Sequence, residues 1–380
     1  MRDVSRRALL RTGAAAAGAA TIIGAGGVAA CSGDGRTGDP SPIVGDGYHM
    51  PLEQAPHERT FMQWPVNVDV YGRDALRRTQ GAVARIANAI ARFEPVVMLV
   101  DAAYHAAASR LLDGGVTLWD VPTDDLWCRD SGPTFVLDTD GGLAVMDFHF
   151  NGWGDKQPHA NDARIAGLVA RRLGLPLIDS GLVGEQGGVE HDGAGLVLAH
   201  ASSWVNPNRN RAGADVIGDR LLGALGGTRM IWAPGVIGAD ITDYHIDSLA
   251  RFVGPGKLLI QMPAALDPDD PWSRSAFETY GIVQRSIDAD DRPLDIVVVA
   301  EPDDIRATGA DFVSSYVNYY VCNGAVVAAQ FGDEEADAAA SALLESLYPG
   351  REVVMLDIDA LGESGGGIHC ATQQQPRAAA

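Results

Sequence analysis

Short apolar segments typical of strands alternate with amphipathic helical segments along most of this 380-residue chain. Residues 95–100, for example, form a continuous apolar run typical of a buried strand. Ile165, Leu168 and Leu173 lie on one face of a predicted helix, and Gly174 directly follows as its expected end. Because strand pairs followed by single helices recur several times, the sequence predicts an α/β body of pseudo-repeated units, without revealing their number. Further strands are expected at residues 115–119, 134–137, 143–150, 196–199, 229–233, 258–262, 296–300, 316–321, 325–329 and 353–357, and further helices near 212–225, 272–286 and 334–347.

The amino-acid composition limits the kinds of ligand that the folded part of the chain can bind. A hydrophobic content of 46% is sufficient for a sizeable core. The net charge is −21, and residues 1–31 contain four arginines and one aspartate, so the remainder carries about −24. A body this acidic repels nucleic acid and attracts cationic ligands. No GxGxxG sequence follows a predicted strand and no P-loop occurs, which argues against a nucleotide-binding fold.

The N-terminal segment has the order of a bacterial export signal, with a disordered tail as the alternative. A basic stretch contains the pair Arg6-Arg7, which resembles a twin-arginine signal, and a weakly apolar Ala/Gly run follows it. The run ends in a lipobox-like sequence at Cys31, the expected site of lipidation. We therefore expect an extracytoplasmic protein with a lipid anchor in the cell membrane. The predicted divisions are a signal peptide at 1–31, a flexible Ser/Gly/Asp/Pro-rich linker at 32–47 and a folded domain at 48–380.

The four cysteines limit the possible disulfide and metal chemistry. They are Cys31, Cys128, Cys322 and Cys370. With Cys31 used as an anchor, at most one disulfide can form and at least one thiol stays free. No CxxC or histidine-rich spacing occurs, so we expect no structural zinc site.

Cys370 stands shortly after a run of three glycines near the C-terminus. Backbone of this kind bends sharply and lets another molecule approach, which suits a nucleophilic thiol; a buried cysteine in a glycine-rich turn is the alternative. Upstream, Asp130 and the pair His245 and Asp247 add two acids and an imidazole. Asp130 capping a turn, and the His-x-Asp pair lying on the surface, are the alternatives for these residues. Together the four residues are typical of nucleophilic catalysis assisted by an acid–base group.

A series of short motifs extends over most of the chain in a fixed order. They are Met50-Pro51 with His57-Glu58, Trp64-Pro65, Trp127-x-Arg129-Asp130-x-Gly132-Pro133-Thr134, Phe150-Asn151-Gly152-Trp153-Gly154, Asn206-Pro207-Asn208-Arg209-Asn210, His245-Ile246-Asp247, Ser315-Tyr316-Val317-Asn318 and Gly365-Gly366-Gly367-Ile368-His369-Cys370. From about residue 50 to residue 376, the chain resembles the agmatine deiminase family, which also includes the bacterial Porphyromonas-type peptidylarginine deiminases. This resemblance implies a five-fold pseudosymmetric α/β propeller of ββαβ units around a substrate channel. It also implies a hydrolase of guanidinium groups that uses a cysteine and needs neither metal nor other cofactor.

The resemblance assigns roles to individual residues. Cys370 corresponds to the nucleophile that attacks the guanidinium carbon, and His245 to the general acid and base. Asp130 and Asp247 correspond to the carboxylates that clamp the guanidinium, a planar cation whose N–H groups suit carboxylates. Glu190 corresponds to the carboxylate that orients the histidine and contacts substrate.

Two aromatic residues are predicted to contact the substrate. Trp127 precedes the Asp130 motif, and core packing is the alternative for its ring. Tyr244 stands where the family usually has a small residue before the His-x-Asp pair, so it is expected to reshape the channel mouth.

The expected reaction converts agmatine to N-carbamoylputrescine and ammonia. A peptidylarginine deiminase is the alternative, an amidinotransferase is compatible with the same chemistry, and a non-catalytic lipoprotein that binds cationic solutes is a third candidate. The segments expected at the channel mouth, residues 148–155 and 240–247, carry Asp155, Asp240 and Asp243 and favour a ligand with a second positive charge. The sequence does not indicate an oligomeric state.

Overall fold

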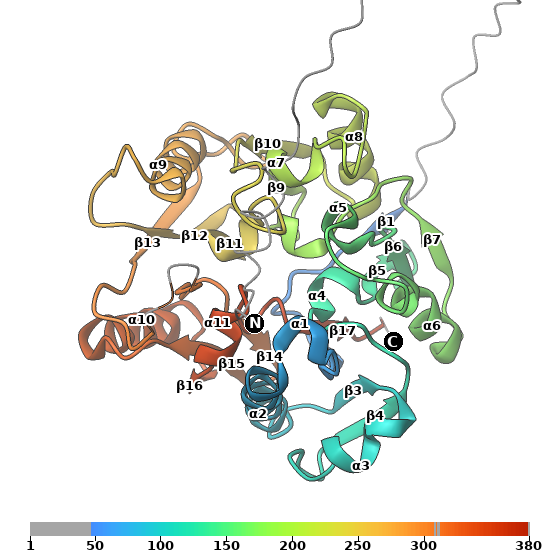
Figure 1. Ribbon diagram of the computed structural model, residues 1–380. Helices are drawn as coiled ribbons and strands as arrows, with labels where there is room; N and C mark the ends of the chain where they lie inside the picture. The colour runs from blue at the N-terminus through green and yellow to red at the C-terminus, as the bar shows by residue number, and fades with distance from the viewer. Residues whose placement is uncertain (1–46, 308, 310–311, 379–380) are drawn as a thin grey trace, which may run out of the picture.

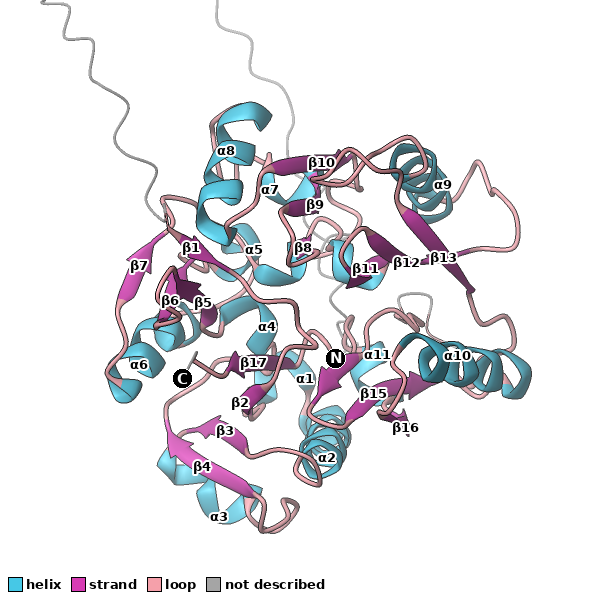
Figure 2. Ribbon diagram, turned by 180° about the vertical axis from the view of Figure 1, so that it is seen from behind, coloured by secondary structure: helices cyan, strands magenta, loops and turns pink. Residues whose placement is uncertain are grey.

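The computed structural model describes residues 47–307, 309 and 312–378. Within these residues the strands form five sheets of three or four strands each. Figure 1 shows the sheets arranged around a common centre, with helices α6, α8, α9 and α10 at the periphery. The same arrangement is seen from behind in Figure 2. The fold is thus a mixed α/β architecture, as the alternating sequence pattern predicts.

One order of elements recurs in all five sheets of the described residues. An antiparallel strand pair is followed by a helix and then by a third strand, which is parallel to the second. The sheets contain β1 (Tyr48–His49), β5 (Thr134–Asp138), β6 (Leu143–Asp147) and β7 (Leu177–Asp179); β8 (Val189–His191), β9 (Leu196–His200) and β10 (Arg229–Ala233); β11 (Ala250–Gly254), β12 (Lys257–Met262) and β13 (Asp295–Ala300); β14 (Tyr320–Cys322), β15 (Ala325–Gln330) and β16 (Glu352–Asp357); and β17 (Thr372–Pro376), β2 (His57–Gln63), β3 (Val96–Val100) and β4 (Val116–Asp120).

The longer helices begin and end at residues that the sequence marks. Asp270 and Asp333 accept backbone N–H groups at the starts of α9 and α10, as N-cap residues do. Gly174 ends α6 in the left-handed conformation, with φ of 69°. The connecting helices are α2 (Arg73–Ile90), α6 (Ile165–Leu173), α8 (Ala214–Leu225), α9 (Pro271–Val283) and α10 (Glu334–Leu347), and the short helical segments are α1 (Val68–Tyr71), η2 (Ala102–Tyr104), α3 (His105–Ala108), α4 (Cys128–Ser131), α5 (Gly152–Asp155), η3 (Asp162–Arg164), η4 (Gln186–Gly188), α7 (Ala201–Trp204), η5 (Ile246–Ser248) and α11 (Asp359–Glu363).

The last strand joins the two ends of the described chain. β17 pairs antiparallel with β2, with Gln373 opposite Phe61, so the C-terminal segment completes the sheet that begins near the N-terminus. All five residues of β17 are buried. This pairing holds the loop that carries Cys370, directly before β17, inside the molecule.

Most predicted strands and helices are confirmed, with two differences. The strand expected at residues 143–150 ends at Asp147. The strand expected at residues 316–321 is shorter, because β14 begins only at Tyr320. Residues 316–318 instead form a turn whose Asn318 side chain bonds to the Cys370 segment. A strand would turn alternate side chains away from that segment.

The predicted signal peptide at 1–31, with Cys31, lies outside the described residues, as does the linker at 32–47 except for Gly47. In the described part of the chain, the helices are all too short or too polar to cross a bilayer.

Candidate active site

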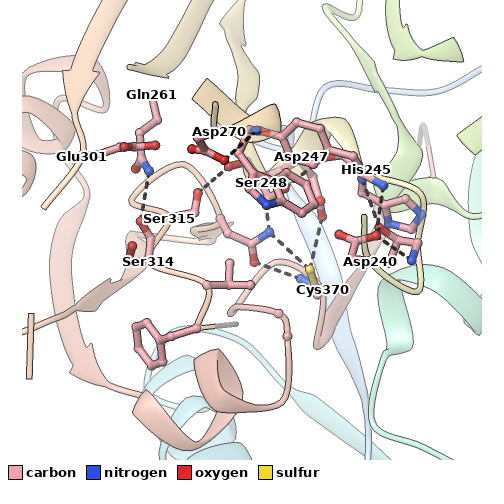
Figure 3. A pocket seen from close by; sticks show the side chains of 18 residues that line it. Asp240, His245, Asp247, Ser248, Gln261, Asp270, Glu301, Ser314, Ser315 and Cys370 are labelled. Atoms are coloured by element: carbon pink, nitrogen blue, oxygen red, sulfur yellow. Dashed lines mark hydrogen bonds between the residues drawn. The ribbon is translucent and has the colours of Figure 1, made fainter. Parts of the chain in front are cut away.

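A cavity of about 190 Å³ opens beside Cys370. Figure 3 shows Cys370, Asp247 and His245 toward one side of it and Gln261 and Glu301 toward the other. The cavity therefore brings the predicted nucleophile together with the predicted histidine and one predicted clamp. Its lining residues are Asp240, Thr242, Tyr244, His245, Asp247, Ser248, Gln261, Asp270, Trp272, Glu301, Phe312, Val313, Ser314, Ser315, Asn318, Gly365, Gly366 and Cys370.

The glycines before Cys370 are needed for close packing. Gly365 has φ of 89°, a conformation that side-chain-bearing residues rarely adopt. A Cβ atom at Gly366 would lie 2.3 Å from the ring of Trp127, and one at Gly367 would lie 2.4 Å from Oδ1 of Asn318. The glycine run therefore lets the loop lie directly on its neighbours while presenting Cys370 to the cavity.

The Cys370 thiol has two polar neighbours. Asn318 Nδ2 donates to Sγ at 3.2 Å, and Sγ lies 3.6 Å from Asp247 Oδ2. Asn318 Oδ1 also accepts the backbone N–H of Cys370 at 3.3 Å. Asn318 thus holds both the backbone and the sulfur of this residue. Sequence reasoning noted the Ser315–Asn318 motif but gave Asn318 no role.

His245 lies between two carboxylates at the wall of the cavity. Its Nε2 is 3.2 Å from Glu185 Oε2, and its Nδ1 is 3.5 Å from Asp130 Oδ1. Burial would lower the pKa of His245, but Asp130, Glu185 and Asp247 raise it above its ordinary value. The surroundings thus favour the protonated imidazolium, the form that can donate a proton.

Asp130 lies in the first turn of α4, where its Oδ2 accepts a hydrogen bond from Trp153 Nε1 at 2.9 Å. The Asp130 carboxylate fits in this position because Gly187, in η4, has no side chain. A Cβ atom at Gly187 would lie 2.7 Å from both Asp130 Oδ1 and His245 Nδ1, and 3.2 Å from Asp247 Oδ2. The absence of a side chain at Gly187 therefore allows the two predicted clamps and the histidine to converge.

Asp247 is fully buried in η5 beside the nucleophile. His369 Nδ1 lies 2.7 Å from its Oδ2, whereas Oδ1 makes no hydrogen bond to any described residue. Burial would raise the pKa of Asp247, but His369, His245 and Arg251 lower it. An ionised carboxylate with one open oxygen suits a guanidinium N–H group.

Glu190 occupies a different place from the one predicted. Its Oε1 accepts from Arg251 Nε at 3.0 Å and its Oε2 from the backbone N–H of Phe252, so it does not orient the histidine. Glu185 contacts His245 instead, and Arg209 Nε donates to Glu185 at 3.0 Å. Burial opposes ionisation of Glu185, but Arg209 and His245 lower its pKa to about 2. The two glutamates are five positions apart in the sequence, and the turn η4 between them gives them different neighbours.

Of the two aromatic residues predicted to contact the substrate, Tyr244 lines the cavity and Trp127 does not. Tyr244 lines the cavity with φ of 70°, and its ring packs edge-on against Trp272 at 4.5 Å between centroids. Trp127 is only 2% exposed and lies under Gly366 rather than in the cavity wall. Its ring packs against Gly366 and so supports the nucleophile loop.

The three acidic residues expected at the channel mouth lie in different surroundings in the structure. Asp240 lines the cavity. Asp243 is buried and paired with Lys156 Nζ and Arg209 Nη1, each at 2.6 Å, so its charge is neutralised. Asp155 is largely exposed and lies outside the cavity lining, where Asp270 and Glu301 contribute carboxylates instead. None of the described residues that line the cavity is Lys or Arg.

Comparisons with known proteins agree on one family. The sequence model of the Porphyromonas-type peptidyl-arginine deiminase family matches residues 49–376. The agmatine deiminase of Stutzerimonas stutzeri is 35% identical over 357 residues, covering 87% of this chain and 96% of the relative. That of Pseudomonas aeruginosa is 35% identical over 359 residues, with the same coverage. The solved agmatine deiminase of Enterococcus faecalis has a TM-score of 0.82 at 26% identity, covering 90% of this chain and 99% of that one.

Proposed function

The chain belongs to the Porphyromonas-type peptidyl-arginine deiminase family, and we propose that it hydrolyses agmatine to N-carbamoylputrescine and ammonia. It is a hydrolase of the C–N bonds of amidines. The observation that favours agmatine is the acidic cavity, in which Asp240, Asp270 and Glu301 accompany the reactive residues without a lining Lys or Arg among the described residues. Agmatine carries a second cation opposite its guanidinium, whereas free arginine carries an α-carboxylate that these acids repel.

The proposed reaction has two steps. Asp130 and Asp247 hold the guanidinium while Cys370 Sγ forms a bond to its carbon. His245 gives a proton to the departing ammonia, which leaves a covalent thiouronium. His245 then takes a proton from water as the water oxygen bonds to the same carbon. The C–S bond breaks as the added hydroxyl group loses its proton to solvent, where ammonia becomes ammonium, so N-carbamoylputrescine is released and the thiolate is restored.

Substrate choice tests the proposal directly. We expect kcat/KM for agmatine to exceed that for free arginine by at least about tenfold at low salt, and added salt to reduce the difference. n-Butylguanidine, which lacks the ammonium group, is the matched substrate. Replacing Glu301 by glutamine should lower kcat/KM for agmatine about fivefold and leave n-butylguanidine unchanged. Ammonia release measures all of these rates.

Peptidyl-arginine is the second candidate substrate, because the matching family is named for that activity and because residues 1–31 resemble an export signal. Arginine-containing peptides therefore belong in the same ammonia assay. Faster turnover of such peptides than of agmatine at equal concentration and low salt would replace agmatine as the proposed substrate.

The pH profile of kcat tests whether Glu185 or Glu190 stabilises the protonated form of His245. The Glu185 carboxylate stabilises the imidazolium of His245, so Glu185→Gln should lower the pKa of His245. Protonated His245 is then lost at lower pH, and the alkaline limb of the kcat profile should move down by about one pH unit. In Glu190→Gln, whose parent side chain contacts Arg251, that limb should stay in place. Equal shifts in both variants would contradict the assignment.

Localisation is a separate part of the proposal: residues 1–31 direct export, residues 32–47 form a tether, and residues 48–380 form one catalytic domain. Replacing Arg6-Arg7 by two lysines should leave the protein in the cytoplasm, because the twin-arginine pair is the export address. Cys31→Ser should release exported protein from the membrane fraction. Cell fractionation measures both outcomes, and an unchanged distribution in either variant would refute the corresponding half.

We also propose that the five sheets are the blades of a five-fold pseudosymmetric α/β propeller. The recurring order of strands and helices supports this arrangement, as does the pairing of β17 with β2. A crystal structure would support it if successive units superpose by rotation about one axis, and would contradict it if they are related by translation.

A further inference from the structure

The short segment α5, which belongs to the Phe-Asn-Gly-Trp-Gly motif, is a left-handed turn. Four consecutive residues have positive φ, namely Gly152 (67°), Trp153 (58°), Gly154 (87°) and Asp155 (58°). The backbone N–H of Asp155 donates to the carbonyl of Asn151 at 2.9 Å, which closes the turn. Glycine adopts this conformation readily, but in tryptophan the Cβ atom then crowds the backbone. The surroundings must therefore hold Trp153 in this conformation.

Side chains around α5 supply these constraints. Asn151 Oδ1 accepts the backbone N–H of Gly154 at 2.8 Å, and Asn151 Nδ2 donates to the carbonyl of Asn208 at 3.0 Å. A Cβ atom at Gly154 would lie 2.5 Å from Cγ of Asn208, so the two segments are in direct contact. The ring of Phe150 packs edge-on against the indole of Trp153, with 5.0 Å between centroids. The turn and the indole are thus fixed from two sides.

In this conformation the indole of Trp153 contacts Asp130, which lies 23 positions earlier in the chain. Trp153 Nε1 donates to Asp130 Oδ2 at 2.9 Å. Trp153 is 1% exposed and the side chain of Asp130 is fully buried, so water does not compete for this contact. The other carboxylate oxygen, Oδ1, lies 3.5 Å from His245 Nδ1. The indole therefore determines which oxygen of Asp130 faces the histidine.

We propose that Trp153 is a positioning residue for Asp130, because the left-handed turn holds its indole N–H on Oδ2 and leaves Oδ1 toward His245 and the guanidinium. An indole N–H can only donate, and a hydrogen bond to an ionised acceptor is stronger than one to a neutral acceptor. Without this donor, the Asp130 carboxylate would be freer to rotate about its Cβ–Cγ bond. The inference deepens the proposed function: its catalytic consequence rests on guanidine hydrolysis, whereas the hydrogen bond does not.

Burial of a tryptophan in this chain does not by itself require such a turn. Trp64 is also 1% exposed, but its φ is not positive and its Nε1 makes no hydrogen bond to any described residue. The left-handed conformation and the indole hydrogen bond occur together at Trp153, where the indole contacts an acid of the candidate site. Backbone strain that the surroundings maintain at such a place points to function rather than to packing alone.

Trp153→Phe tests the proposal, since phenylalanine keeps an aromatic ring in α5 but has no N–H group. We expect kcat/KM for agmatine to fall about 30-fold, because Asp130 loses its fixed orientation. Trp64→Phe is the matched control: the same change removes no hydrogen bond among the described residues, so kcat/KM should stay within about twofold of wild type. In an Asp130→Asn background, Trp153→Phe should cost less than about threefold, because the carboxylate on which it acts is absent.

NMR of ¹⁵N-tryptophan-labelled protein tests the hydrogen bond without any turnover. The contact with the Phe150 ring identifies the indole signal of Trp153, and Trp64→Phe identifies that of Trp64. An N–H group bonded to a carboxylate resonates downfield of one bonded to a neutral acceptor. We therefore expect Asp130→Asn to move the Trp153 indole proton upfield by about 0.5 ppm and to leave the Trp64 signal in place.

The proposal is overturned if the Trp153 signal does not respond to Asp130→Asn. It is also overturned if Trp153→Phe lowers kcat/KM no more than Trp64→Phe does, or lowers it equally with and without the Asp130 carboxylate. The NMR result decides the question if Trp153→Phe does not fold. Absence of agmatine turnover in the wild type, together with the expected NMR shift, would refute the proposed function and still support the positioning of Asp130.

Discussion

Replacing Cys370 by alanine is expected to lower kcat about 10⁴-fold or more while agmatine still binds. The covalent step requires the Cys370 sulfur, and alanine has no nucleophilic atom at this position. The clamping carboxylates of Asp130 and Asp247 remain in the variant, so binding of the cation should persist. Ammonia release measures the turnover, and isothermal titration calorimetry measures the affinity for agmatine.

The matched control for this substitution is Cys322→Ala. Cys322 is also buried, but it lies in β14, and burial raises the pKa of its thiol well above the ordinary value. Cys322→Ala should therefore keep wild-type turnover. Iodoacetamide should label Cys370 in preference to Cys322, and this labelling should disappear in Cys370→Ala. Turnover near the wild-type rate in Cys370→Ala would refute the covalent mechanism.

Hydrophobic periodicity predicted the peripheral helices and the apolar central strands, because burial of one face leaves a regular sequence pattern. It did not predict β17, whose sequence is Thr-Gln-Gln-Gln-Pro. This strand is buried although its side chains are polar, and Gln374 accepts a hydrogen bond from Arg129 Nη1 at 2.8 Å. A polar strand of this kind is specified by partners distant in sequence, and no local pattern reports them.

The candidate site, like the fold, could be predicted from the sequence only in part. Cys370, His245, Asp130 and Asp247 stand in distinctive motifs, and the structure brings them together. The choice between Glu185 and Glu190 depended on backbone geometry, because the turn η4 at Gln186–Gly188 separates the two side chains. The sequence pattern around both residues is compatible with either choice. Asn318 and His369 likewise acquire their roles only through contacts across the fold.

The second large effect is expected at the two clamping aspartates. Asp130→Asn and Asp247→Asn should each raise the activation free energy for kcat/KM with agmatine by at least about 3 kcal/mol. The value of kcat/KM should therefore fall on the order of 100-fold. Both side chains are buried, at 5% and 0% exposure, so a guanidinium beside them is removed from water and depends on their charges. Asparagine keeps the shape of the side chain but removes that charge. Steady-state ammonia assays over a range of agmatine concentrations give kcat/KM.

The two variants should differ in their pH profiles, which separates clamping from general acid–base catalysis. Asp130 is the foremost carboxylate in raising the pKa of His245, so Asp130→Asn should also move the alkaline limb of kcat to lower pH. Asp155→Asn is the control, because that carboxylate is 82% exposed and lies outside the cavity lining. A solvated charge at that position contributes little to binding. If Asp130→Asn and Asp247→Asn both retain wild-type kcat/KM, the guanidinium binds elsewhere and the clamp assignment fails.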